Sequence, residues 1–296
     1  MEQGLVTSIA AERKPGALEH SLLLLIPAYN EEQRIGPVLR EFAAYFERAY
    51  PDRFQLVVVL NGCRDNTLGV VQDAAKEFRS IRALNFPAPI GKGGALIEGL
   101  KLASAADLIG YVDADGATSP EAFHHLVKRL DDTGADCTIG SRWLPESVLH
   151  QSQTQLRRFI SRGFHYLVEV LFWMGIKDTQ CPAKVARREA VQKIHSDLRV
   201  ADLAFDVNFV YSLKHAGFTV VEIPIEWTDK IGSKVTQSLV RSSLVMALSV
   251  VRLRTYYSPF YRWLQPPLRP VEAWLYKKLR APLPPSKPLN SDSKHS

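Results

Sequence analysis

Short apolar segments alternate with longer segments of helical character along the first 140 residues of the chain. The first two apolar runs, LLLLI at 22–26 and FQLVVVL at 54–60, show almost no polar alternation. Such runs are typical of strands buried on both faces of a parallel sheet, and the stretches between them have the length of helices. The sequence therefore predicts an α/β fold, with a mostly parallel, Rossmann-like sheet covered by helices on both faces. Further strands are expected at 81–85, 107–112, 135–139 and 218–225, and helices at 31–50, 66–79, 92–106, 119–132, 156–176, 199–216 and 236–254.

Polar motifs follow three of these strand runs. They are PAYNEE at 27–32, NGCRDNT at 61–67 and DADGAT at 113–118. In doubly covered sheets, ligands bind in the crevice beyond the carboxyl ends of the strands. We therefore expect the functional site at this edge of the sheet.

The DADGAT motif places two like charges close together. Asp113 and Asp115 are two residues apart, so on an extended backbone both point to the same side. A helix cap does not require them, because Ser119 followed by Pro120 already forms a typical helix start. A solvated turn is one explanation. A site for Mg²⁺ or Mn²⁺, held by few protein ligands and by substrate phosphates, is the other and the one we favour.

The other strand-end motifs offer groups for a nucleotide. Tyr29 presents a ring on which a base could stack, after a turn that Pro27 would fix. Asn61 or Asp65 could contact a base or ribose, although both residue types also serve as turn residues and helix caps. The GKGGA segment around Lys92 is not a Walker A loop, yet its glycines allow close approach of an anion at a helix N-terminus. Packing of the helix on the sheet explains those glycines equally well.

The second half of the chain carries a basic cluster beside an apolar helix. Arg142 follows the strand at 135–139, and Arg157 and Ser161 begin a helix whose apolar face runs to residue 172. Arginines usually coat a solvated face, but here few acids are available to pair with them. This pattern fits a phosphate with an apolar tail.

Three further residues are candidates with structural alternatives. Asp178 and Asp206 could be catalytic or could be helix caps. Lys234, in the loop after the strand at 218–225, brings another positive charge near a strand end.

Composition limits the partners and the compartment. The formal net charge is +6, and the excess is concentrated between residues 252 and 280, which favours anionic partners. The three cysteines are widely spaced, as expected in a reducing compartment. No signal peptide, membrane-spanning helix or nucleic-acid-binding motif is expected. We expect a protein peripheral on the cytoplasmic face of an anionic membrane. Its domain division is a flexible arm at 1–20, a catalytic domain at 21–235, amphipathic and basic membrane-surface helices at 236–280, and a disordered tail at 281–296.

The order of the motifs carries more information than any single one. IPAYNEE, NGCRDNT, GKGGA, DADGAT, GSR, DTQC, FDV and WTDKIGSK follow one another over residues 21–255. This order resembles the family 2 glycosyltransferases of the GT-A fold, and among them the polyprenyl-phosphate branch, the dolichyl-phosphate glucose and mannose synthases.

The resemblance implies roles for residues of this chain. Pro27, Tyr29, Glu31, Asn61, Asp65, Lys92 and Asp113 would bind the sugar nucleotide. Asp113 and Asp115 would hold the Mg²⁺ or Mn²⁺ that bridges its diphosphate. Arg157, Ser161 and Lys234 would bind the acceptor phosphate. The candidate catalytic residues are Asp206, Arg142 and Asp178.

The implied reaction is inverting, metal-dependent transfer of a hexose from a UDP-glucose or GDP-mannose type donor to a polyprenyl or dolichyl phosphate. Two departures from the family pattern stand out. Asn61 and its neighbours replace a usual acidic DDGS turn, which leaves the base open. Ala117 replaces a third metal ligand, so the metal should bind weakly until the diphosphate arrives.

Three other functions remain open at this point. A family 2 enzyme with a hydroxyl acceptor would need a general base. A sugar nucleotidyltransferase shares the glycine-rich and basic character, but it would not need the DTQC and GSK motifs. A basic membrane adaptor would explain the charge but not the strand-end motifs.

Overall fold

The computed structural model describes residues 20–150, 155–228 and 239–261, together with residues 263, 270, 271 and 274. Within these, the side chains of 155–159, 239 and 240 are not described. The predicted arm at 1–20, except for its last residue, and the predicted tail at 281–296 lie outside the described residues.

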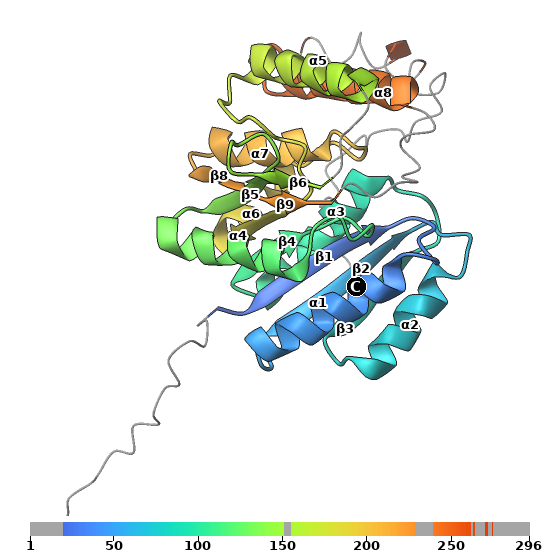
Figure 1. Ribbon diagram of the computed structural model, residues 1–296. Coiled ribbons are helices and arrows are strands. Elements are labelled where there is room, and N and C mark those ends of the chain that lie inside the picture. Colours follow the sequence, from blue (N-terminus) through green and yellow to red (C-terminus); the bar gives the residue numbers. More distant parts are fainter. Residues whose placement is uncertain are drawn as a thin grey trace, which may run out of the picture.

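A seven-stranded sheet forms the centre, with strand order β3-β2-β1-β4-β7-β5-β8 (Figure 1). All of its pairings are parallel except those of β7, which runs antiparallel to β4 and β5. The strands are β1 (Leu22–Ala28), β2 (Phe54–Asn61), β3 (Ile81–Phe86), β4 (Leu108–Tyr111), β5 (Cys137–Ser141), β7 (Lys184–Arg187) and β8 (Val220–Pro224). The predicted mostly parallel sheet is therefore confirmed.

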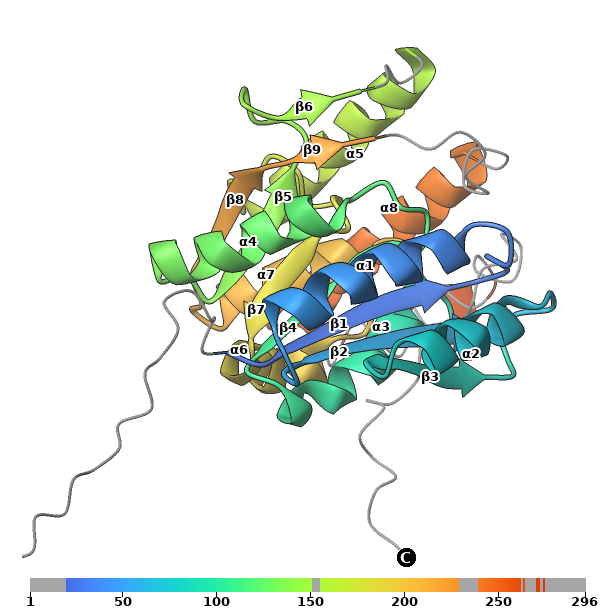
Figure 2. The same ribbon diagram turned by 60° about the horizontal axis from the view of Figure 1, so that its bottom comes forward.

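Helices cover both faces of this sheet, as predicted. Alternate residues of β1 point to opposite sides, so Leu24 packs beneath one layer of helices and Leu25 beneath the other. One layer consists of α1 (Ile35–Ala49), α2 (Thr67–Glu77) and α4 (Pro120–Thr133) (Figure 2). The other consists of α3 (Lys92–Leu100), the 3₁₀ turn η1 (Lys101–Ala105), α6 (Arg188–Ile194), the 3₁₀ turn η2 (His195–Asp197) and α7 (Phe205–His215).

Two long helices lie outside α7. They are α5 (Gln155–Phe172) and α8 (Leu239–Tyr256), which run side by side in Figure 1. Tyr211 of α7 joins them, because its ring contacts Phe172 of α5 and Tyr257 after α8. Among the described residues, no helix combines the length and apolarity needed to cross a bilayer.

The structure corrects the sequence predictions in several places. The helices expected at 92–106 and 156–176 end earlier, at Leu100 and Phe172. Strand β7, helix α6 and the small sheet of β6 (Val148–Leu149) and β9 (Glu226–Trp227) were not expected, because segments of two to seven residues show no clear periodicity. The helix expected at 199–216 begins only at Phe205. Its expected first turn is instead a loop, in which the side-chain oxygen Oδ1 of Asn208 accepts hydrogen bonds from the backbone N–H groups of Arg199 and Val200.

An aromatic cluster anchors the first helix layer, and we predict that it dominates the stability of this half. The Phe46 ring is fully buried and stacks on Phe54 at 5.0 Å between centroids, with Phe123 edge-on at 5.9 Å. Phe46→Ala should lower the free energy of unfolding by about 3–5 kcal/mol, and Phe46→Leu by clearly less, because a smaller cavity remains. Urea denaturation followed by circular dichroism measures both. Equal losses for the two variants would contradict the cavity argument.

Candidate active site

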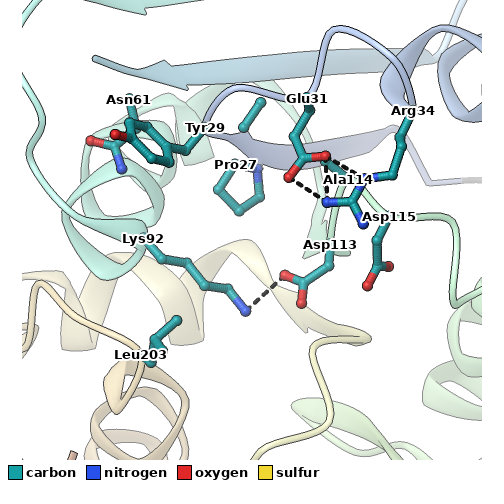
Figure 3. A pocket seen from close by; sticks show the side chains of 11 residues that line it. Pro27, Tyr29, Glu31, Arg34, Asn61, Lys92, Asp113, Ala114, Asp115 and Leu203 are labelled. Atoms are coloured by element: carbon teal, nitrogen blue, oxygen red, sulfur yellow. Dashed lines mark hydrogen bonds and ion pairs between the residues drawn. The ribbon is translucent and has the colours of Figure 1, made fainter. Parts of the chain in front are cut away.

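A cavity of about 280 Å³ opens at the carboxyl ends of β1, β2 and β4 (Figure 3). This is the edge at which the strand-end motifs predicted a site. The lining residues are Pro27, Ala28, Tyr29, Glu31, Arg34, Asn61, Lys92, Asp113, Ala114, Asp115 and Leu203. All of the residues predicted to bind the donor lie here except Asp65, and so do both predicted metal ligands.

The turn after β1 forms one wall of the cavity. Tyr29 is 42% exposed, and the next residue, Asn30, adopts a positive φ of 55° that turns the chain toward α1. Glu31 accepts two hydrogen bonds from the Arg34 guanidinium, each 2.8 Å long. Arg34 was not predicted, because it lies in the turn that precedes α1, where the spacing of residues gives no periodic signal.

The turn after β2 places Asn61 in the cavity and Asp65 outside it. The side-chain oxygen Oδ1 of Asn61 accepts hydrogen bonds from the backbone N–H groups of Ile90 (2.6 Å) and Gly91 (3.0 Å). Both bonds go to the oxygen, so Asn61 can offer a ligand only its amide N–H groups. It thereby fixes the loop that leads into α3.

Asp65 ties two loops together. Its carboxylate accepts hydrogen bonds from the backbone N–H of Thr67 (3.1 Å) and from that of Glu32 (3.2 Å). Burial alone would raise the pKa of Asp65, but these hydrogen bonds and one from the Thr67 hydroxyl lower it. These bonds fit the structural alternative for Asp65 at the start of α2, and its predicted contact with the donor stays a prediction.

Lys92 and Asp113 form an ion pair across the cavity. The Lys92 Nζ lies 2.7 Å from Asp113 Oδ1 and 3.9 Å from Asp206 Oδ2. Burial opposes a charge on Lys92, but the two carboxylates outweigh it and raise the pKa of Lys92. The glycine after it makes this position possible, because a Cβ on Gly93 would lie only 2.2 Å from the Val200 carbonyl oxygen.

The two carboxylates of the DADGAT motif suit a divalent metal. Asp115 accepts a 3.0 Å hydrogen bond from the Ala117 backbone N–H, so Ala117 orients this side chain instead of supplying a third ligand. Burial and the like charge of Asp113 raise the pKa of Asp115, a cost that a divalent cation would relieve. Within the described residues, no group of three or more His, Cys, Asp or Glu side chains gathers around a common point. Asp113 and Asp115 therefore fit a hard cation whose remaining ligands come from a substrate.

Asp206 lies beneath the cavity, not in its lining. The residue is 1% exposed at the start of α7. Its Oδ1 accepts a hydrogen bond from the Tyr111 hydroxyl (2.7 Å) and forms an ion pair with the Lys184 Nζ (2.5 Å). The carboxylate reaches the cavity only through Lys92, which places it close to the site without exposing it to substrate.

Arg142 and Asp178 form a buried pair at the end of β5. The Arg142 Nε and Nη2 donate to the two Asp178 oxygens at 2.7 and 2.9 Å, and the guanidinium lies over the Trp227 ring at 5.1 Å. Burial would raise the pKa of Asp178, but Arg142 lowers it. The pair does not line the cavity, so its predicted catalytic role stays a prediction.

The residues predicted to hold the acceptor phosphate are only partly described. Ser161 lies on α5 and is half-buried, away from the cavity lining. The Arg157 side chain and Lys234 lie outside the described residues.

The chain has relatives of known family. The model of the family named Glycosyl transferase family 2 matches residues 24–195. The dolichyl-phosphate beta-glucosyltransferase ALG5C of Trichomonas vaginalis is 35% identical over 241 residues, which cover 79% of this chain and 70% of that protein. The chain belongs to glycosyl transferase family 2. It is a glycosyltransferase, and the predicted family resemblance is confirmed.

One further relative and one solved structure are similar to this family 2 enzyme. The dolichyl-phosphate beta-glucosyltransferase of Homo sapiens is 31% identical over 255 residues, which cover 82% of this chain and 72% of the human protein. Among solved structures, glucosyl-3-phosphoglycerate synthase of Mycobacterium tuberculosis, in complex with Mn²⁺ and UDP, superposes with a TM-score of 0.60 at 15% identity, covering 79% of this chain and 80% of that one. At this identity the likeness confirms the GT-A fold alone.

Several residues of the site escaped the sequence analysis of this glycosyltransferase. Leu203 lines the cavity from the loop before α7, and Tyr111 and Lys184 face Asp206 from neighbouring strands. Tyr111 stood in a quoted motif but looked like an ordinary strand residue. Lys184 gave no local signal, because only the antiparallel register of β7 places it opposite Tyr111.

The two candidate metal-site carboxylates should affect stability to different extents. A carboxyl whose pKa is raised by folding destabilises the protein above its unfolded-state pKa, and this cost grows until the pH passes the raised pKa. Asp115→Asn removes this cost and should raise the Tm of the metal-free protein at pH 7 by about 2–4 °C. The gain should shrink as the pH falls through the raised pKa of Asp115.

Asp113→Asn is the matched comparison. It relieves the same repulsion but also removes the ion-pair partner of Lys92, so its Tm should lie below that of Asp115→Asn under the same conditions. Thermal denaturation with a chelator present, between pH 4 and pH 7, measures both variants. A lower Tm for Asp115→Asn at pH 7 would contradict the assigned repulsion.

Proposed function

We propose that this enzyme transfers glucose from UDP-glucose to the phosphate of dolichol or a related polyprenol, with Mg²⁺ or Mn²⁺ and with inversion at the sugar. The observation that carries the proposal is the cavity in which paired carboxylates and Lys92 converge. Relatives up to 35% identical are dolichyl-phosphate beta-glucosyltransferases, which supports glucose as the transferred sugar and dolichyl phosphate as the acceptor.

The residues of the cavity suit the departure of a nucleoside diphosphate. Asp113 and Asp115 would hold the metal, which when bound neutralises charge on the leaving diphosphate. Lys92 adds a positive charge on the same side, and Tyr29 offers a ring for the base. Charges that are held in place before the reaction stabilise the negative charge that develops on the leaving diphosphate.

The surroundings of Asp206 favour a phosphate acceptor over a hydroxyl acceptor. A hydroxyl needs a general base within hydrogen-bond reach. Asp206 is buried and engages Tyr111, Lys184 and Lys92, so it does not face an incoming acceptor. A phosphate monoester is mostly ionised at pH 7, since its second pKa is about 6, and it can attack without a base.

Product analysis tests this function. The purified enzyme with Mn²⁺, UDP-glucose and a polyprenyl phosphate should form a glycosyl phospholipid that mass spectrometry detects. In-line attack on an α-linked donor should give a β anomer by NMR. GDP-mannose in place of UDP-glucose and a polyprenol in place of its phosphate are the controls. Turnover with the free polyprenol, or an α-linked product, would contradict the proposal.

We further propose that the enzyme is peripheral on the cytoplasmic face of a membrane. Helices α5 and α8 lie side by side and carry exposed apolar side chains. Trp173, directly after α5, is 84% exposed. Trp263, beyond α8, is also 84% exposed. Exposed aromatic residues next to basic segments are typical of helices that lie in a membrane interface. This surface would bring the enzyme to its lipid acceptor.

Vesicle sedimentation tests the membrane proposal. Trp173→Ser and Trp263→Ser should each weaken binding to vesicles that contain anionic lipid, because each removes an aromatic anchor. Leu102→Ser, an exposed apolar position on η1, is the matched control and should bind as wild type does. Equal binding by all three variants would contradict the assigned surface.

A further inference from the structure

A row of alternating charges runs from the core of the protein into the cavity. It begins at Lys184, continues through Asp206 and Lys92, and ends at Asp113. Lys184 and Asp206, the two members of this row that lie in the core, do not line the cavity. The function proposed above uses Lys92 and Asp113 but gives Lys184 no role.

The core end of this row is unusually well fixed. Lys184 is fully buried, and its ammonium donates to the Cys181 carbonyl oxygen as well as to Asp206. It also lies 5.4 Å from the centroid of the Tyr111 ring. Lys184 and Tyr111 are directly opposed in the antiparallel register of β7 and β4, so the sheet itself holds both groups on one side of Asp206.

The two oxygens of Asp206 are divided between the core and the cavity. Oδ1 is engaged by Tyr111 and Lys184, which leaves Oδ2 turned toward the Lys92 ammonium at 3.9 Å. Burial and the Asp206 charge raise the pKa of Tyr111, so its phenol remains a hydrogen-bond donor to Asp206. A carboxylate held in this way cannot rotate without breaking its bonds in the core.

We infer that Lys184 is a positioning residue of the transfer reaction, which acts through Asp206 to keep the Lys92 ammonium aimed at the donor diphosphate. Lys92 can then turn from Asp113 to an incoming diphosphate while Asp206 retains it from below. Without Lys184, Oδ1 of Asp206 loses one of its two partners in the core, the carboxylate can turn, and Lys92 is no longer held at the floor of the cavity. This inference rests on the proposed donor site.

A double-mutant cycle on nucleoside diphosphate binding tests this role. Lys184→Met should weaken the binding of UDP or GDP with Mn²⁺ by about tenfold, and Lys92→Met by at least as much. In the Lys92→Met background, Lys184→Met should add less than about twofold, because its effect passes through Lys92. Isothermal titration calorimetry measures the four affinities, and Thr138→Val, which removes a buried hydrogen bond in neighbouring β5, is the control for lost stability alone.

A second variant separates positioning from folding. In Lys184→Met/Asp206→Asn neither charge is buried alone, so the Tm should return toward that of wild type while the diphosphate affinity stays low. This variant also replaces Lys184→Met in the comparison with Lys92→Met if the single variant does not fold. Wild-type affinity in Lys184→Met/Asp206→Asn would show that the ion pair only stabilises the fold. If the losses of diphosphate affinity caused by Lys184→Met and Lys92→Met multiply when the two are combined, Lys184 acts independently of Lys92. Either result overturns the inference.

The choice of probe keeps this inference distinct from the proposed function. Wild-type enzyme that binds GDP but not UDP contradicts the UDP-glucose donor, while the comparison of Lys184 with Lys92 still holds. Wild-type enzyme that binds neither diphosphate contradicts the donor site and the inference together.

Discussion

The buried carboxylate of Asp206 joins the parts of this enzyme that the chain order keeps apart. It accepts from Tyr111 on β4, pairs with Lys184 on β7 and faces Lys92 on α3, while its own backbone starts α7. A buried charge is tolerated only when partners compensate it, and here all of the partners come from other elements. The placement of α3 and α7 over the sheet and the charge inside the cavity therefore depend on the same group.

The two halves of the sheet carry different groups that a substrate could contact. Strands β1, β2 and β4 end at the cavity and supply the carboxylates, the amide and the aromatic ring suited to a nucleotide. Beyond the antiparallel strand β7, the Arg142–Asp178 pair lies at the end of β5, and helices α5 and α8 lie on the outer side. This arrangement suits a reaction that takes one substrate from water and the other from a lipid surface.

The site residues differ in how well their roles could be predicted from local patterns. Asp113 and Asp115 follow a strand that is buried on both faces, and such strands bring their ends to one edge, so the cavity could be expected. Asp65 stands in a similar turn, yet its oxygens bond to the backbone of Thr67 and Glu32. Aspartates serve as readily in caps as in ligand sites, and only the neighbouring loop decides between the two.

The sequence by itself determined the parallel sheet, its two helix layers and the edge where the site lies, because hydrophobic periodicity and strand-end motifs are local properties. Only the tertiary structure decided that Asp206 is enclosed and that Lys184 is its partner. That contact depends on the antiparallel register of the four-residue strand β7, which places Lys184 opposite Tyr111. A strand so short shows no periodicity, and its pairing is set by the long-range packing of the sheet around it.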